Sequence, residues 1–171
     1  GTTHTIYLPL NVFHDDVFIR QRYETILGLY LKLYICNMDS IYTLEQTNEI
    51  ATQLVQQYAS KSVWVFQAPM GAGKTTLIAA IGKAMGIQEA MSSPTFSIMN
   101  EYEVQGKLIY HMDWYRLDNE AEARQAGVEA ALEEADMSLV EWPEKAPNLV
   151  PDDAVLIHIE ILDPNRRRIY I

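Results

Sequence analysis

Cysteine is nearly absent from this 171-residue sequence. The single Cys36 cannot form an internal disulfide, and no second cysteine or histidine stands near it at the spacing of a metal site. Because structural disulfides belong to oxidising compartments, this scarcity favours the cytoplasm. Long hydrophobic runs are also missing. The most apolar stretch, residues 26–35, is interrupted and too short to span a bilayer, and the N-terminal sequence lacks signal-peptide features, so we expect no membrane segment.

Basic residues are scarce as well. The sequence has 13 Lys and Arg against 23 Asp and Glu, for a formal net charge of -10, and residues 118–144 are especially acidic. The only basic cluster is the short arginine run at 166–168. A protein that grips RNA by itself normally neutralises phosphates with Lys and Arg side chains. The charge therefore predicts that any RNA substrate is held by another protein.

A glycine-rich loop is the most informative motif. The sequence Gly-Ala-Gly-Lys-Thr-Thr occupies residues 71–76, between a β-branched apolar run and a helix-like segment. Such a loop curls its backbone N–H groups around phosphate oxygens, while the lysine reaches the β- and γ-phosphates and the next hydroxyl ligates Mg²⁺. The strict pattern begins with glycine at the position that Ala68 occupies here. We predict Mg-ATP or Mg-GTP binding by Met70, Gly71, Ala72, Gly73, Lys74, Thr75 and Thr76.

The pattern around this loop predicts an α/β fold. We expect a P-loop domain at residues 38–171 and an extension of unknown role at residues 1–37. A capping-box sequence opens the first predicted helix, and a break near Gly127 divides the last. The predicted helices are 43–58, 75–85 and 121–135, and the predicted strands are 63–66, 96–102, 107–112, 138–142, 154–161 and 167–171. This alternation predicts a P-loop NTPase-like three-layer fold with a mixed, mostly parallel central sheet.

An acid at a strand end is the second candidate for the metal site. Asp113 directly follows the predicted strand 107–112, at a strand end where a carboxylate can support Mg²⁺ across from a P-loop. Because residues two apart on a strand share a face, His111 is expected beside Asp113. His111 fits a packed, hydrogen-bonded histidine as well as a catalytic one.

Two further segments carry candidate functional residues. The Ser-Ser-Pro-Thr sequence ending at Thr95 fits either an ordinary turn or a switch that senses the γ-phosphate. Glu141 lies near the end of the predicted strand 138–142 and could orient the attacking water, because active sites of open α/β sheets gather at strand ends. Trp142 could stack on a base, although an aromatic residue beside proline is more often packing material.

These motifs together resemble the bacterial TsaE family, ATPases of tRNA threonylcarbamoyladenosine biosynthesis. The resemblance runs through Gly-Ala-Gly-Lys-Thr-Thr at 71–76, Ser-Pro-Thr-Phe at 93–96, His-Met-Asp-Trp-Tyr-Arg-Leu at 111–117, Gly127 with Glu129, and Val-Glu-Trp-Pro-Glu at 140–144. It implies that Asp113 supports the metal and that Thr95 belongs to a switch. It also implies that Glu141 acts in hydrolysis and that Trp142 contacts the base.

The resemblance further implies indirect chemistry. Partner proteins of the TsaB and TsaD type transfer the threonylcarbamoyl group to tRNA, and the ATPase enables their repeated turnover. Two other functions fit the motifs. A small-molecule kinase would transfer phosphate to a substrate hydroxyl that Asp113 or Glu141 activates. A nucleotide-dependent interaction module would bind ATP with negligible turnover and would not need Glu141.

Overall fold

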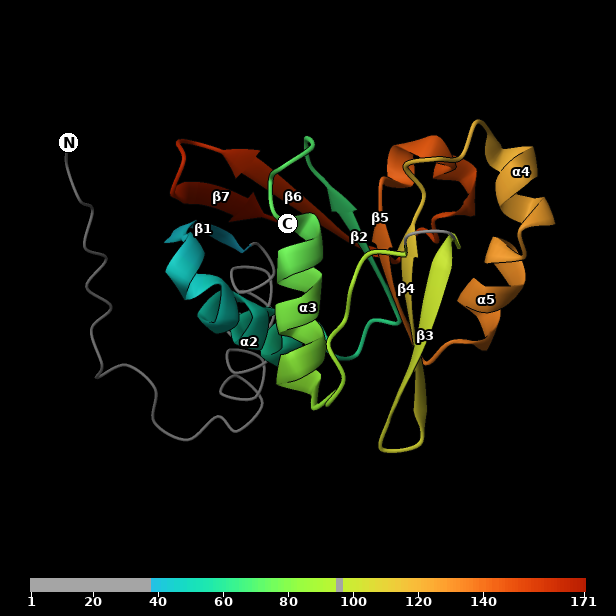
Figure 1. Cartoon of the computed structure of the whole chain (residues 1–171), viewed down its shortest axis with the longest axis horizontal. Helices are drawn as coiled ribbons and strands as arrows, with labels where there is room; N and C mark the ends of the chain where they lie inside the picture. Colours follow the sequence, from blue (N-terminus) through green and yellow to red (C-terminus); the bar gives the residue numbers. More distant parts are fainter. Residues whose placement is uncertain (1–37, 95–96) are drawn as a thin grey trace, which may run out of the picture. The chain divides into compact units, whose positions relative to one another are not determined.

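A seven-stranded sheet runs through the described part of the chain (Figure 1). The computed structural model describes residues 38–94 and 97–171, so the extension at 1–37 and Thr95 lie outside the described residues. The strands are β1 (Asp39–Thr43), β2 (Val63–Gln67), β3 (Met99–Val104), β4 (Lys107–Asp113), β5 (Met137–Glu141), β6 (Val155–Ile161) and β7 (Arg166–Tyr170). The α-helices are α2 (Thr47–Tyr58), α3 (Lys74–Met85), α4 (Glu120–Gln125) and α5 (Val128–Glu134).

The strand order is β1-β7-β6-β2-β5-β4-β3. The four central strands β6, β2, β5 and β4 are parallel, whereas β3 pairs antiparallel with β4, and β7 pairs antiparallel with both β6 and β1. Strand β1 therefore points the same way as the central four, and only β3 and β7 are reversed. This topology confirms the predicted α/β fold with its mixed, mostly parallel sheet.

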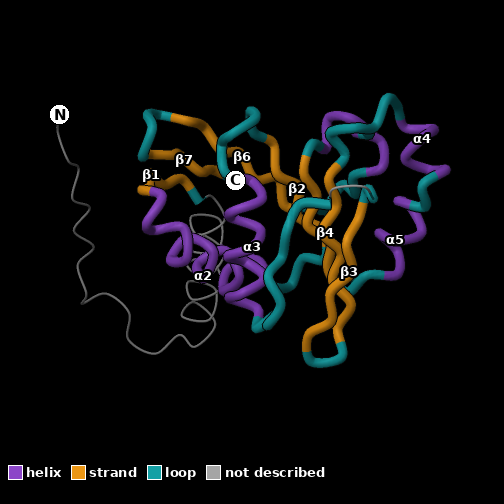
Figure 2. Tube along the Cα trace, viewed as in Figure 1, coloured by secondary structure: helices purple, strands orange, loops and turns teal. Residues whose placement is uncertain are grey.

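Helices cover both faces of the sheet, which confirms the three layers. Alternation along β2 sends Trp64 and Phe66 into the core beneath α2 and α3, and sends Val63 and Val65 into the core beneath α4 and α5. All four side chains are buried because β2 is central, which explains its continuous apolar sequence. Loops at the strand ends join the sheet to the helices on its two faces (Figures 1 and 2).

Local sequence signals correctly predicted where several turns and helix ends lie. The backbone N–H of Thr43 donates to the Gln46 side chain at 2.9 Å, as the capping box requires, although the first turn is a 3-10 helix at Leu44–Gln46 before α2 begins. The β3–β4 hairpin turns through Gln105 and Gly106, both with positive φ. Helices α4 and α5 are separated at Gly127, whose φ is +80°.

The structure differs from the predictions most at the two edge strands of the sheet, β1 and β3. Strand β1 was not predicted, because a short edge strand takes its conformation from its partner; Ser40 pairs with Ile169 of β7. Strand β3 begins at Met99, three residues after the predicted start at 96. Additional 3-10 turns at Pro143–Lys145 and Pro147–Leu149 follow β5, where proline at the first position suits a helical turn.

The packing of α2 gives a stability prediction. The Leu54 side chain is fully buried against the sheet, whereas the adjacent Gln53 is exposed. Leu54→Ala leaves a cavity, so it should lower the free energy of unfolding by about 2–5 kcal/mol in urea denaturation. Gln53→Ala is the matched control and should change that free energy by less than about 0.5 kcal/mol. Equal effects of the two substitutions would contradict this packing.

Candidate functional site

The glycine-rich loop joins the carboxyl end of β2 to the first residue of α3. Gly71 and Gly73 have φ values of +76° and +96°, a region that side chains rarely adopt, and the Ala72 N–H donates to the Pro69 carbonyl at 3.2 Å. Ala68 does not have a positive φ, because the only described non-glycine residues with a positive φ are Gln105 and Trp142. This ordinary backbone explains why alanine is accepted where the strict pattern has glycine.

Lys74 lies inside the loop rather than in solvent. Its side chain is buried, and Nζ donates to the carbonyls of Ala68 and Pro69 at 2.9 and 3.2 Å. Burial lowers the pKa of Lys74, and the nearby acids, Glu141 first among them, oppose that shift. A bound phosphate would act in the same direction as these acids and favour the charged ammonium. The geometry therefore presents a cation at the start of α3, where the helix also favours anions.

A hydrogen-bonded chain links Thr75 to two neighbouring strands. The Thr75 hydroxyl donates to Oε1 of Glu141 at 2.8 Å, and Nε2 of His111 lies 3.0 Å from the same oxygen. A carboxylate oxygen can only accept, so Nε2 carries a proton in this contact. Glu141 and His111 are both buried, and Nδ1 of His111 has no partner among the described residues. His111 thus fixes the orientation of the Glu141 carboxylate, whichever of its two predicted roles holds.

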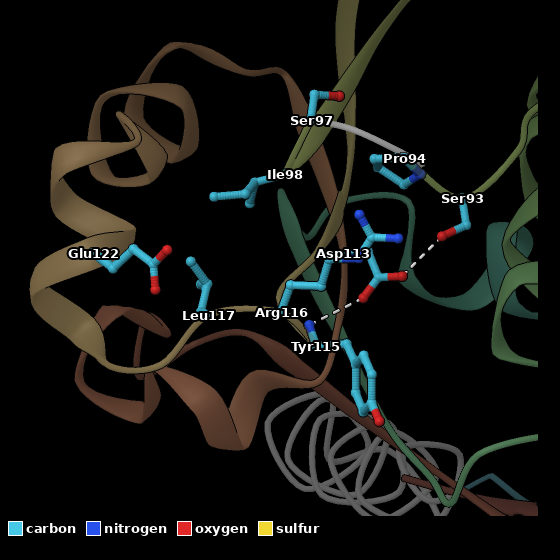
Figure 3. A pocket seen from close by; sticks show the side chains of 9 residues that line it. All are labelled: Ser93, Pro94, Ser97, Ile98, Asp113, Tyr115, Arg116, Leu117 and Glu122. Atoms are coloured by element: carbon cyan, nitrogen blue, oxygen red, sulfur yellow. Dashed lines mark hydrogen bonds between the residues drawn. The ribbon is translucent and has the colours of Figure 1, made fainter.

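Asp113 lies beside Glu141 but has different partners. The two residues are paired across β4 and β5. Oδ2 of Asp113 accepts from the Ser93 hydroxyl at 2.8 Å and Oδ1 accepts from the Tyr115 N–H at 3.0 Å (Figure 3). The contact from the P-loop hydroxyl to Glu141, rather than to Asp113, was not predicted. Nothing in the sequence indicates which of two strand-end acids reaches Thr75, because that depends on strand order.

Trp142 covers the loop lysine. Its backbone has a φ of 61°, and its ring centroid lies 3.8 Å from Nζ of Lys74 and 5.0 Å from the ring of Tyr115. A cation over an indole face is a favourable contact. The Trp142 ring therefore lies next to Lys74, the residue at which the loop ends and α3 begins. Its contact with a base stays a prediction.

A pocket of about 380 Å³ collects most of the predicted site residues. Ala72 is the one described residue of the predicted site that does not line this pocket, because its side chain is buried. Thr95 is not described. Met70 is 62% exposed and lies at the rim. The pocket is lined by Met70, Gly71, Gly73, Lys74, Thr75, Thr76, Asp113, Tyr115, Glu141 and Trp142. Tyr115 was not among the predicted site residues.

A second pocket of about 420 Å³ shares Asp113 and Tyr115 with the first. Figure 3 shows the residues that line this second pocket. Its remaining walls are Ser93, Pro94, Ser97, Ile98, Arg116, Leu117 and Glu122. Asp113 therefore faces two hollows, one beside the P-loop and one beside α4. In this position the Asp113 carboxylate is accessible both from the P-loop pocket and from the pocket beside α4.

The oxygen-rich pocket fits Mg²⁺ together with a nucleotide. Mg²⁺ prefers oxygen ligands and shares them with substrate phosphates in such sites, so one hydroxyl and nearby carboxylates suffice. The described residues contain no group of three or more His, Cys, Asp or Glu side chains that could hold a metal ion. Among the described helices, none has the length and apolar character needed to cross a membrane.

Comparisons with known proteins agree with this geometry. The family model described as threonylcarbamoyl adenosine biosynthesis protein TsaE matches residues 41–169. A "tRNA threonylcarbamoyladenosine biosynthesis protein TsaE" of Haemophilus influenzae is 32% identical over 129 residues, covering 75% of this chain and 82% of the relative. The protein of the same name from Aquifex aeolicus is 37% identical over 130 residues, covering 74% and 89%. The crystal structure of Bacillus subtilis YdiB superimposes with a TM-score of 0.62 at 25% identity, covering 78% and 83%.

Proposed function

Because the chain belongs to the TsaE family of threonylcarbamoyl adenosine biosynthesis proteins, we propose that it is an ATPase of tRNA threonylcarbamoyladenosine modification. In this proposal it binds Mg-ATP in the P-loop pocket and hydrolyses it. Hydrolysis supports repeated turnover by a partner complex of the TsaB and TsaD type. The chain contacts tRNA only indirectly and works in the cytoplasm.

The observation that carries the proposal is the contact between Thr75 and Glu141. A P-loop hydroxyl that ligates Mg²⁺ through its lone pair can still donate a hydrogen bond, and Oε1 of Glu141 accepts that hydrogen bond from Thr75 at 2.8 Å. Lys74 supplies positive charge for the β- and γ-phosphates from within the same pocket. Mg²⁺ would add a Lewis acid that neutralises the phosphate oxygens, held by Thr75 and supported by Asp113 and Glu141.

The proposed hydrolysis uses the two acids differently. Glu141 is buried, and Thr75 and His111 both contact its Oε1, so Oε2 would be the oxygen that orients a water. Asp113 is half-buried and also lines the second pocket, from which a partner protein would approach it. A switch-type ATPase is slow until a partner orders its loops, so we expect slow hydrolysis by the chain alone.

The surface charge supports indirect contact with tRNA. The exposed acids of α4 and α5 include Glu122, Glu129 and Glu133, and they would repel a phosphate backbone. The arginine run at 166–168 does not offset them, because each of its side chains already binds a group within the chain. A partner protein that holds the tRNA is therefore part of the proposal.

Product analysis tests the reaction type. The chain is incubated with Mg-ATP alone and with a panel of small hydroxyl compounds, and both inorganic phosphate and phosphorylated products are measured. ATPase function predicts phosphate release that does not depend on any added hydroxyl compound. Stoichiometric transfer of phosphate to one compound would overturn the proposal in favour of a kinase, and binding without any turnover, even with partners present, would favour an interaction module.

Asp113→Asn tests the metal assignment. Removing this charge should raise the Mg²⁺ concentration needed for half-maximal ATP binding by about tenfold, because one of the acids beside the metal is neutralised. Calorimetric titration of ATP at graded Mg²⁺ concentrations measures the shift. Asp118→Asn neutralises an exposed acid that does not line the pocket and is the matched control. An unchanged Mg²⁺ requirement in Asp113→Asn would remove Asp113 from the metal site.

A further inference from the structure

The three consecutive arginines at the start of β7 have separate tasks. Alternation along the strand puts Arg166 and Arg168 on one face, where they pair with Asp163 and with Asp39. Arg167 points to the opposite face, toward the core beneath α2 and α3, and is only 7% exposed. The structure thus divides a run that looks in the sequence like one basic patch.

Arg167 binds the P-loop from behind. Its Nε donates to the carbonyl of Ala72 at 3.1 Å, and Nη1 donates to the carbonyls of Asp163 and Arg166 at 2.7 and 3.0 Å. Its hydrogen bonds within the described residues all go to backbone carbonyls. A buried guanidinium without a carboxylate partner is costly, so a purely structural role would be better served by an apolar side chain.

The contact with Ala72 sets the direction of the next amide. The peptide bond between Ala72 and Gly73 is trans, so its C=O and N–H point in opposite directions. When Arg167 holds the Ala72 carbonyl on the buried side, the Gly73 N–H turns away from that side. Gly73 lines the P-loop pocket and has a φ of +96°. Glycine has many accessible backbone conformations, so a contact from outside the loop helps to hold its peptide in one of them.

We infer that Arg167 is a positioning residue that holds the P-loop in its phosphate-binding conformation. It acts through the Ala72–Gly73 peptide and touches no reacting atom. The planar guanidinium reaches three carbonyls of two segments at once, which a lysine ammonium on a flexible stem cannot reproduce. The inference rests on the proposed nucleotide binding, because it concerns the same loop.

Three variants of the full chain test this role. Arg167→Met removes the guanidinium but keeps an unbranched stem, and should raise the Kd for Mg-ATP about 10- to 100-fold in calorimetric titration, the loss expected for hydrogen bonds to a charged group. Arg167→Lys keeps the positive charge but lacks the planar guanidinium with its several N–H donors, and it should also raise the Kd for Mg-ATP about tenfold or more. Arg168→Met is the matched control, since it removes a neighbouring arginine that does not touch the loop, and should bind as the wild type does.

A second readout does not need nucleotide. In the nucleotide-free protein, the amide-proton NMR shift of Gly73 should move in both Arg167 variants, while amides of β2 stay in place. The inference would be overturned if Arg167→Lys bound Mg-ATP with wild-type affinity and its Gly73 amide shift did not move. This result would decide the matter even if Arg167→Met failed to fold. If the wild type does not bind Mg-ATP, the proposed function fails, and the Gly73 amide still decides whether Arg167 positions the loop.

Discussion

Lys74→Ala is expected to raise the Kd for Mg-ATP about 100-fold or more. The Lys74 ammonium is buried in the P-loop pocket, where burial lowers its pKa and makes its charge costly without an anion. Phosphate oxygens relieve that cost through charge-assisted hydrogen bonds, which the alanine variant cannot form. Calorimetric titration of the nucleotide-free protein with Mg-ATP measures the loss directly.

Lys83→Ala provides the matched control for this substitution. Lys83 lies in the last turn of the same helix α3 and is exposed, so its removal tests the general effect of losing one positive charge. Its Kd should stay within about twofold of the wild type, in line with small effects of surface substitutions. Unchanged affinity in Lys74→Ala, with a folded protein, would show that the nucleotide does not bind in this pocket.

Glu141→Gln is expected to separate binding from turnover. The substitution keeps the size of a buried side chain that lies between Thr75 and His111, but it removes the negative charge that activates water. The rate of ATP hydrolysis should fall by about 10²- to 10⁴-fold, the usual contribution of a general base. At saturating Mg²⁺ the Kd for Mg-ATP should change by less than about tenfold, because Lys74 is unchanged and the amide oxygen of the glutamine can still accept from Thr75. Single-turnover phosphate release together with calorimetry gives both quantities.

Glu133→Gln controls for the loss of one acid. Glu133 is exposed on α5 and does not line the P-loop pocket, so both the rate and the Kd should match the wild type. If Glu141→Gln hydrolysed ATP at the wild-type rate, Glu141 would have no part in hydrolysis. If that variant also sustained full tRNA modification, the interaction-module function would be the better account of the chain.

Much of the fold could be predicted because the signals are local. The strand β2, the glycine loop and helix α3 follow one another without interruption, and each is encoded by its own residues. The break at Gly127 and the β3–β4 turn at Gly106 are also local, since both need a positive φ. Strand β1 was missed because its conformation depends on pairing with β7, more than a hundred residues later.

The candidate site was predicted only in part, for the same physical reason. Strand-end acids could be recognised along the chain, but the contact between Thr75 and Glu141 depends on β5 lying next to β2 in the sheet. The contact of Arg167 with Ala72 likewise joins residues 95 positions apart. No local pattern distinguishes Arg167 from Arg166 or Arg168 until strand alternation and the position of β7 are known.

The most direct test of the account is multiple-turnover threonylcarbamoylation of unmodified tRNA. Active partner enzymes of the TsaB and TsaD type are supplied with Mg-ATP and substrates, with and without this chain, and modified tRNA per partner complex is counted over time. The account predicts that modification continues beyond one round only when the chain is present, and that Lys74→Ala cannot replace it. Equal turnover with and without a chain that binds Mg-ATP would contradict the proposed role.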